Sequence, residues 1–230
     1  NNCDLVCFSS IHKEATPVHN LAIIKEPQII FKTQGAVNDI ITTDLNGDNI
    51  DDIVFCDSRN YIIALNALDN EIIWKYRLTN ALQYLTTTDY NMDGVKDILG
   101  LNREGNIVLI DGLIGRMIWE RNLINDEKLP YRNILVNQML VTDLNNDGKA
   151  HELVIAIGLK LYPIGSIMVY NLTSKEIIWK SVQYYSPFWK FYVADLDNDG
   201  FKEIVAASYG RSINIYDALD GHQIFGYSVM

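Results

Sequence analysis

Short apolar segments of four to seven residues, rich in Ile, Val and Tyr, alternate along the chain with turns built from Asp, Asn, Gly and Ser. This composition is typical of β-strands and turns, and no window keeps the 3.6-residue periodicity of an amphipathic helix. The longest mainly apolar stretch, residues 153–170, is interrupted by Gly158, Lys160, Pro163 and Gly165. We therefore interpret it as two strands around a turn and not as a membrane span.

The polar and apolar segments repeat four times as a two-part pattern. The first part is an acidic segment that begins at Asp44, Asp89, Asp143 or Asp195, with spacings of 45, 54 and 52 residues. The second part is an apolar segment that ends near an aromatic residue: Trp74, Trp119, Trp179 or Phe225. Each copy is predicted to form four strands, with the acidic segment joining the first strand to the second. In the second copy the strands cover residues 84–88, 97–101, 106–111 and 116–123.

A sheet of four short strands cannot bury both of its faces alone, so neighbouring copies have to stack, and radial stacking of such sheets gives a β-propeller. The recurrent aromatic residue is expected to pack between neighbouring blades. A further copy begins part-way at the N-terminus, where CDLVCFSS from Cys3 matches DDIVFCDS from Asp51 and places Asp4 where Asp52 stands. The segment LAIIKEPQIIFKTQG that follows from Leu21 resembles the third and fourth strands of a copy. The prediction is one all-β domain over 1–230 that is a piece of a larger propeller. It divides into a partial blade at 1–35 and blades at 36–80, 81–125, 134–182 and 188–230.

Each acidic segment places oxygen-bearing side chains at positions 1, 3, 5 and 9, counted from its first Asp. Alternate residues of a tightly wound loop can point toward one centre, and the main-chain carbonyl of position 7 can join them, so the spacing predicts a site for one ion. Position 6 is Gly94, Gly148 or Gly200 in three copies and Asn49 in the first, which are residues that accept the positive φ of such a turn. Oxygen ligands without His or Cys favour Ca²⁺ over transition metals, and flexible carboxylate-rich sites favour it over Mg²⁺.

Calcium is therefore the predicted cofactor, at up to four sites. The first site comprises Asp44, Asn46, Asp48, Ile50 and Asp52, and the second comprises Asp89, Asn91, Asp93, Val95 and Asp97. The third comprises Asp143, Asn145, Asp147, Lys149 and Glu152, and the fourth comprises Asp195, Asp197, Asp199, Phe201 and Glu203. The fourth site has the most carboxylates and is expected to bind most tightly. The third has one extra residue before Glu152, with His151 at the ninth place, and is expected to be weak or distorted.

The acidic segments have two other interpretations. An EF-hand is excluded, because position 12 is not Glu but Phe55, Gly100, Val154 or Ala206, and strand-forming residues follow. The segments could also be simple Asp-Asn-Gly turns.

The chain has 29 Asp and Glu against 19 Lys and Arg, a net charge of −10, which argues against a nucleic-acid binder. Four Ca²⁺ ions would reduce this charge to roughly −2.

The loop and the strand that follows it, D-x-[DN]-x-D-[GN]-x-x-[DE]-[IL]-[VL], resemble the calcium-binding FG-GAP or VCBS-type repeats of integrin α-subunit propellers and of many secreted or surface proteins. The resemblance covers nearly the whole chain, although the Phe-Gly and Gly-Ala-Pro segments of the family are not evident. The second half of each copy, as in ALNALDNEIIW and YDALDGHQIF, also resembles PQQ-type quinoprotein repeats. The first resemblance implies that the calcium loops stiffen the lower face of the propeller and that a ligand binds the opposite face.

That opposite face would carry two long connections, residues 124–137 and 181–190. Aromatic residues beside Arg or Lys are common at binding surfaces, so the candidate ligand contacts are Tyr131, Arg132, Tyr184, Tyr185 and Trp189. The same side chains could instead fill the channel or pack between blades. Because the sequence shows no catalytic constellation, the expected function is a calcium-stabilised recognition or adhesion module for a protein or glycan, and not an enzyme. The alternatives are a polysaccharide lyase or hydrolase and a quinoprotein-like oxidoreductase.

An extracellular or cell-surface location is expected, because calcium sites of moderate affinity are typical of extracellular modules. Asn171 begins an N-glycosylation sequon, and it aligns with the turn residues Asn66, Asp111 and Asp217 of the other copies. Asn171 is therefore a candidate glycosylation site. The expected partners are a protein or glycan ligand and further blades or flanking domains, with no transmembrane segment or signal peptide in this chain.

Overall fold

The computed structural model describes residues 3–7, 28–33, 35–126, 134–159, 165–181 and 186–228. Four sheets of four antiparallel strands make up most of this part of the chain, and consecutive strands are neighbours in every sheet. We call these sheets blades 1 to 4. A pair of strands, β1 (Cys3–Cys7) and β2 (Gln28–Thr33), precedes them. Among the described residues, no helix is long and apolar enough to cross a membrane.

The strands of the blades are as follows. Blade 1 consists of β3 (Val37–Thr43), β4 (Asp52–Asp57), β5 (Tyr61–Leu65) and β6 (Ile72–Arg77). Blade 2 consists of β7 (Tyr84–Thr88), β8 (Asp97–Leu101), β9 (Asn106–Ile110) and β10 (Met117–Asn122), followed by the short helix α1 (Leu123–Asp126). Blade 3 consists of β11 (Ile134–Thr142), β12 (Glu152–Leu159), β13 (Gly165–Asn171) and β14 (Glu176–Lys180). Blade 4 consists of β15 (Phe188–Ala194), β16 (Glu203–Ser208), β17 (Ser212–Asp217) and β18 (Gln223–Ser228).

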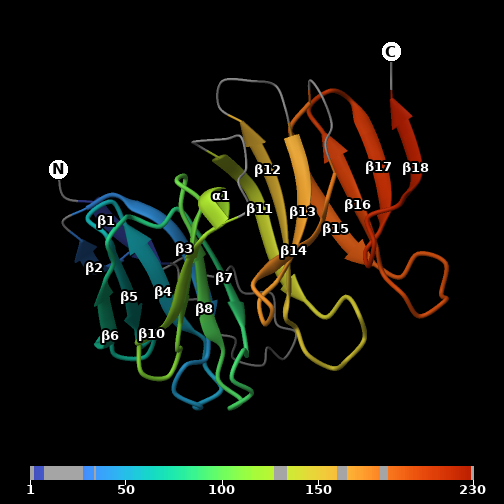
Figure 1. The fold of residues 1–230 in the computed structure, drawn as a ribbon. Helices are drawn as coiled ribbons and strands as arrows, with labels where there is room; N and C mark the ends of the chain where they lie inside the picture. The colour runs from blue at the N-terminus through green and yellow to red at the C-terminus, as the bar shows by residue number, and fades with distance from the viewer. Residues whose placement is uncertain are drawn as a thin grey trace, which may run out of the picture.

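The four blades fan out side by side (Figure 1), with β1 and β18 at opposite ends of the fan. The first strands of successive blades contact one another: β3 contacts β7, β7 contacts β11, and β11 contacts β15. The fourth strand of each blade forms the other edge of its sheet. First strands gathered at the centre with later strands radiating outward are the arrangement of a β-propeller. The predicted fold, a partial propeller of four-stranded blades, is confirmed.

The predicted strands agree closely with the observed ones. The apolar stretch 153–170 forms β12 and β13, as expected. In blade 2 the expected fourth strand was one residue too long at each end, because β10 covers Met117–Asn122 and Leu123 begins α1. The amide of Leu123 donates to the carbonyl of Gly105 at 2.8 Å, and its side chain is buried between blades 2 and 3, so the chain leaves the β-ladder there.

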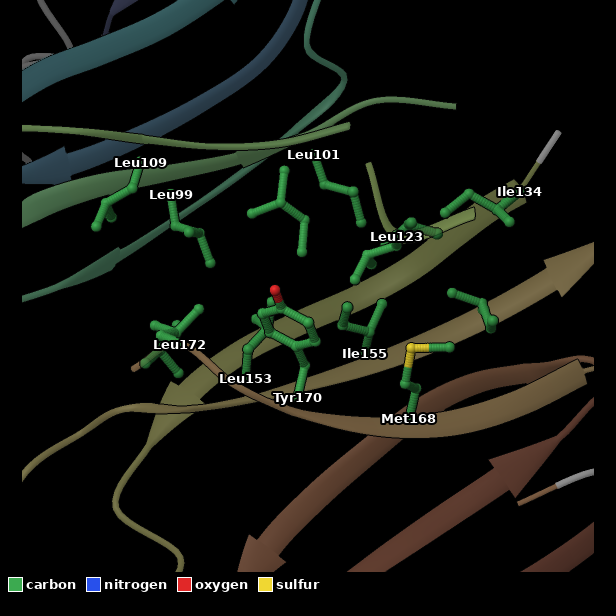
Figure 2. Packing of buried hydrophobic residues seen from close by; sticks show 14 residues of the cluster. Leu99, Leu101, Leu109, Leu123, Ile134, Leu153, Ile155, Met168, Tyr170 and Leu172 are labelled. Carbon is green, nitrogen blue, oxygen red and sulfur yellow. The ribbon is translucent and has the colours of Figure 1, made fainter. Parts of the chain in front are cut away.

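Three of the four hydrophobic clusters of the described residues lie between blades, and the fourth, made of Ile53, Phe55, Ile63 and Leu65, belongs to blade 1 alone. Figure 2 shows one interface, where Leu99, Leu101 and Leu109 of blade 2 face Leu153, Ile155 and Tyr170 of blade 3. A second cluster joins blades 1 and 2, and a third joins blades 3 and 4. Since each large aliphatic side chain contributes about 1.5–3 kcal/mol when fully buried, the blades stabilise one another.

Two of the repeated tryptophans close these interfaces at their outer edge. Trp74 of blade 1 donates from Nε1 to the carbonyl of Gly112 in blade 2 at 2.7 Å, and its ring lies against Gly115. Trp179 of blade 3 donates to the carbonyl of Ala218 in blade 4 at 2.9 Å. The expectation that these residues pack between blades is confirmed for both.

The N-terminal pair differs from the sequence interpretation in one respect. The comparison with blade 1 equates β1 with a second strand and β2 with a fourth strand, yet β1 pairs directly with β2, Cys3 opposite Thr33. In the four blades a second strand pairs with the first and third strands only. Residues 8–27, which would supply a third strand, lie outside the described part of the chain.

Candidate metal-binding loops

Each acidic segment connects the first strand of a blade to the second, as the sequence predicts. The segments join β3 to β4, β7 to β8, β11 to β12 and β15 to β16. Figure 1 shows these four connections along the lower edge of the fan. The repeat thus places all four acidic loops at one end of the propeller.

Within each loop, side-chain oxygens accept hydrogen bonds from the loop's own amides. The amide of position 7 donates to the carboxylate of position 5 at 2.8 Å in every copy: Ile50 to Asp48, Val95 to Asp93, Lys149 to Asp147, and Phe201 to Asp199. The amide of position 6 donates to the first Asp in every copy, at 2.8–3.2 Å. These bonds wind the loop around its own carboxylates, which is the arrangement expected of a turn that gathers oxygen ligands.

Two residues of each loop adopt positive φ, at positions 4 and 6. Position 6 is Asn49, Gly94, Gly148 or Gly200, as predicted. Position 4 is Gly47, Met92, Asn146 or Asn198, and the sequence interpretation missed it. Three of these four residues are of types that tolerate the left-handed region, so the signal was present, but Met92 obscured it. Met92 is 61% exposed and its φ is 58°.

The acid at position 9, or position 10 in blade 3, plays a different role from the others because it is buried. Asp52 accepts hydrogen bonds from the amides of Leu45 in its own loop and of Ala67 in the turn after β5. Asp97 does the same with Tyr90 and Gly112. In blades 1 and 2 the acid therefore clamps the loop to the next hairpin turn of the same blade.

Burial raises the pKa of the carboxyls of Asp52, Asp97 and Glu152 above their ordinary values. Neighbouring carboxylates raise the pKa further, since Asp48 and Asp44 lie near Asp52. The pKa of Asp44 is lowered: desolvation opposes the shift, but hydrogen bonds from the backbone amides of the loop outweigh it. The loops therefore concentrate negative charge around buried acids, and a bound cation would offset this repulsion.

The fourth loop brings three carboxylates closest together. The side chains of Asp195, Asp197 and Glu203 each offer an oxygen, and these oxygens lie within 4.8 Å of one another. Asp199, the remaining predicted side-chain ligand, accepts the amide of Phe201. Asp and Glu oxygens at this spacing fit a hard cation such as Ca²⁺.

The third loop accommodates its extra residue without changing positions 1 to 7. The amide of Leu144 donates to Glu152 at 3.1 Å, just as Leu45 donates to Asp52. The extra residue is taken up by a bond from the amide of His151 to the carbonyl of Lys149. The expected distortion is therefore absent from the first seven positions of this loop.

Loops 3 and 4 are also joined to each other. The ammonium group of Lys202 donates to the main-chain carbonyl of Asp143, and the side-chain amide of Asn146 donates to the carbonyl of Gly200. These bonds cross from blade 3 to blade 4, so the two loops hold one another in place.

Asn171, the predicted glycosylation site, is already engaged. Its Nδ2 donates to the buried Glu152 at 3.2 Å, and its Oδ1 accepts the amides of Thr173 and Ser174. Asn66, Asp111 and Asp217 cap the equivalent turns through bonds to the amides of Leu68, Ile114 and Leu219, so the four residues share one structural role. The half-buried Asn171 amide thus supports the third loop.

Of the predicted ligand contacts, the structure describes one. Trp189 is 52% exposed, and its ring centroid lies 5.9 Å from that of the exposed Tyr209. Trp189 lies near the start of β15 and Tyr209 directly follows β16, so both are at the end of blade 4 away from the fourth acidic loop. The other candidates, Tyr131, Arg132, Tyr184 and Tyr185, lie outside the described residues.

No family model and no curated protein matches the sequence. Solved structures do resemble the fold. BamB from Moraxella catarrhalis has a TM-score of 0.55 at 14% identity, over 86% of this chain and 52% of that one. The Dos1 propeller has a TM-score of 0.61 at 11% identity, over 86% and 48%, and BBS1N in complex with ARL6DN has 0.57 at 11%, over 86% and 53%. The chain thus spans about half the length of the propellers it resembles.

Proposed function

We propose that this chain is part of a calcium-stabilised extracellular β-propeller that serves as a recognition or adhesion module for a protein or glycan. The observation that carries the proposal is the repetition of one loop in four blades: the same amide-to-carboxylate bonds, two left-handed residues and a buried acid. A turn that served only to reverse the chain would not need an acid buried at position 9 or 10 in every copy.

The residues proposed to hold calcium are the acids and asparagines at positions 1, 3 and 5 with the buried acid that follows, together with the position 7 carbonyl. Bound calcium would supply positive charge that offsets the mutual repulsion of these carboxylates. The chain's own residues set the loop: the buried acid fixes it to the next hairpin turn, and the left-handed positions allow its tight winding. Binding to the folded state alone then stabilises the propeller by mass action.

Thermal unfolding in Ca²⁺, Mg²⁺ and a chelator tests the calcium role. We expect the melting temperature to rise with Ca²⁺ and to rise less with Mg²⁺, because Mg²⁺ demands a more rigid site. Replacing Asp195→Asn and Asp197→Asn together should reduce the calcium-dependent rise. The control is Asp69→Asn, an exposed turn residue outside the loops, which should leave the rise intact. Equal melting temperatures in calcium and chelator would refute the proposal.

Recognition is proposed for the end of the propeller away from the loops. The exposed pair Trp189 and Tyr209 supports it, because exposed aromatic residues commonly anchor protein and glycan ligands. One solved structure of similar fold, BBS1N, is in complex with ARL6DN. Screening of glycan and extracellular-protein arrays tests this role. A ligand whose binding survives both Trp189→Ala and Tyr209→Ala would place recognition elsewhere.

A further inference from the structure

The outward side of blade 4 carries two rows of mostly apolar side chains that no described residue covers. One row crosses the sheet as Tyr192, Val205, Ile215 and Phe225, and the other as Lys190, Ala207, Ile213 and Tyr227. We call these eight residues the terminal face. Ile213 is 48% exposed, Phe225 50%, Tyr227 57% and Tyr192 74%. Exposed apolar side chains that gather on one face in this way mark an interaction site.

The same two rows exist in blade 1, where most of their side chains are buried and the rest are partly buried. They run as Ile41, Val54, Ala64 and Trp74, and as Asp39, Cys56, Ile62 and Tyr76. Val54, Cys56, Ile62 and Ala64 have no exposed surface, because Leu82, Leu85 and Val108 of blade 2 pack onto them. In blade 3 the corresponding rows are buried against blade 4. The terminal face therefore occupies the structural place of an interface between blades.

Polar contacts mark the same place. Asp39 of blade 1 accepts the amide of Leu85 in blade 2 at 2.7 Å. Gln138 of blade 3 accepts the amide of Phe191 in blade 4 and donates to its carbonyl, both at 3.0 Å. In blade 4 the equivalent residue is Lys190. Like Asp39 and Gln138, it directly follows the shift in register between the first and second strands of its blade. Lysine can only donate, so its partner in a following sheet would be a main-chain carbonyl.

We propose that the terminal face receives a further four-stranded blade of the same repeat type, seated on blade 4 as blade 2 is seated on blade 1. Phe225 occupies the position that Trp74 and Trp179 occupy in their blades. Its side chain has no N–H that needs a hydrogen-bond acceptor, so the further blade has to offer only an apolar contact there. The interface continues a series of three that the chain already forms. The proposal does not depend on calcium binding or on the ligand.

Cysteine labelling of the whole polypeptide that contains this chain tests the proposal. Ala207→Cys lies in the centre of the terminal face and Ser174→Cys lies on an exposed turn of blade 3, and both residues are exposed in the isolated fan. Mass spectrometry of the two peptides separates their labelling from that of Cys3, Cys7 and Cys56. We expect labelling at Ala207→Cys to be about 100-fold slower than at Ser174→Cys, because a docked sheet must open before the thiol reacts.

The proposal is supported if Ala207→Cys is labelled slowly at every protein concentration while the mass of the protein is that of a monomer. Equally fast labelling at both positions would overturn it, since the face would be bare. Slow labelling that appears only where the mass doubles would also overturn it, because a second copy would then cover the face. If the Ala207→Cys protein fails to fold, hydroxyl-radical footprinting of the unaltered protein also distinguishes a covered terminal face from a bare one. Tyr192 and Tyr227 should then be protected relative to the exposed Met92.

Discussion

Replacing Gly115 with alanine should weaken the contact between blades 1 and 2 much more than a glycine-to-alanine change elsewhere. Gly115 has φ 67°, and a Cβ atom there would lie 2.5 Å from Cγ of Trp74. The left-handed conformation costs alanine about 1–2 kcal/mol. Forcing the Trp74 ring away adds about 1–3 kcal/mol. If the ring moves, the buried carbonyl of Gly112 loses its donor, which adds about 1–3 kcal/mol.

The expected loss in the free energy of unfolding is therefore about 3–8 kcal/mol. The matched control is Gly47→Ala, because Gly47 has φ 79° but a Cβ atom added there would meet no other atom within 4 Å. It should lose only about 1–2 kcal/mol. Urea denaturation measures the loss for both variants, provided that the dependence of the free energy of unfolding on urea concentration is unchanged. Equal losses for the two variants would show that Trp74 does not close the interface as described.

The other stability predictions concern single side chains. Trp179→Phe should lower the free energy of unfolding by about 1–3 kcal/mol, because it leaves the carbonyl of Ala218 without its donor. Trp119→Phe should lower it by less, since the Nε1 of Trp119 is buried without a partner. Urea denaturation compares the two variants. Met92→Gly should raise the stability by up to about 1 kcal/mol, because glycine relieves the left-handed backbone at this exposed position; a lower midpoint would contradict this. The raised pKa of Glu152 means that the folded state binds the proton of this carboxyl more tightly than the unfolded state does. Protonated Glu152 therefore stabilises the folded state fully below the ordinary pKa of 4.5, and this stabilisation is lost as the pH rises through the folded pKa. In chelator, the wild-type protein should therefore lose stability relative to Glu152→Gln as the pH rises from 4.5 toward neutrality; parallel pH profiles would contradict the assignment.

The strand pattern could be predicted from the sequence because each blade repeats the same short apolar runs and turn residues. The place of each acidic segment between two predicted strands likewise indicated which strands the acidic loop joins. The inter-blade position of Trp74 followed from the need of a small sheet to bury both faces.

Other features depend on tertiary contacts that no local pattern records. Burial of Asp52 and its bond to the amide of Ala67 connect residues 15 positions apart. The role of Asn171 as a donor to Glu152 was hidden by its sequon, which suggested a solvent-exposed amide. The pairing of Asp39 with Leu85 joins two blades, so it depends on how the sheets stack and not on either strand alone.

The most direct test of the central claim is native mass spectrometry of the protein in about 1 mM Ca²⁺ and after chelation. The account predicts up to four bound Ca²⁺ ions per chain, with one fewer when Asp195 and Asp197 are both changed to Asn. An identical mass before and after chelation would contradict it.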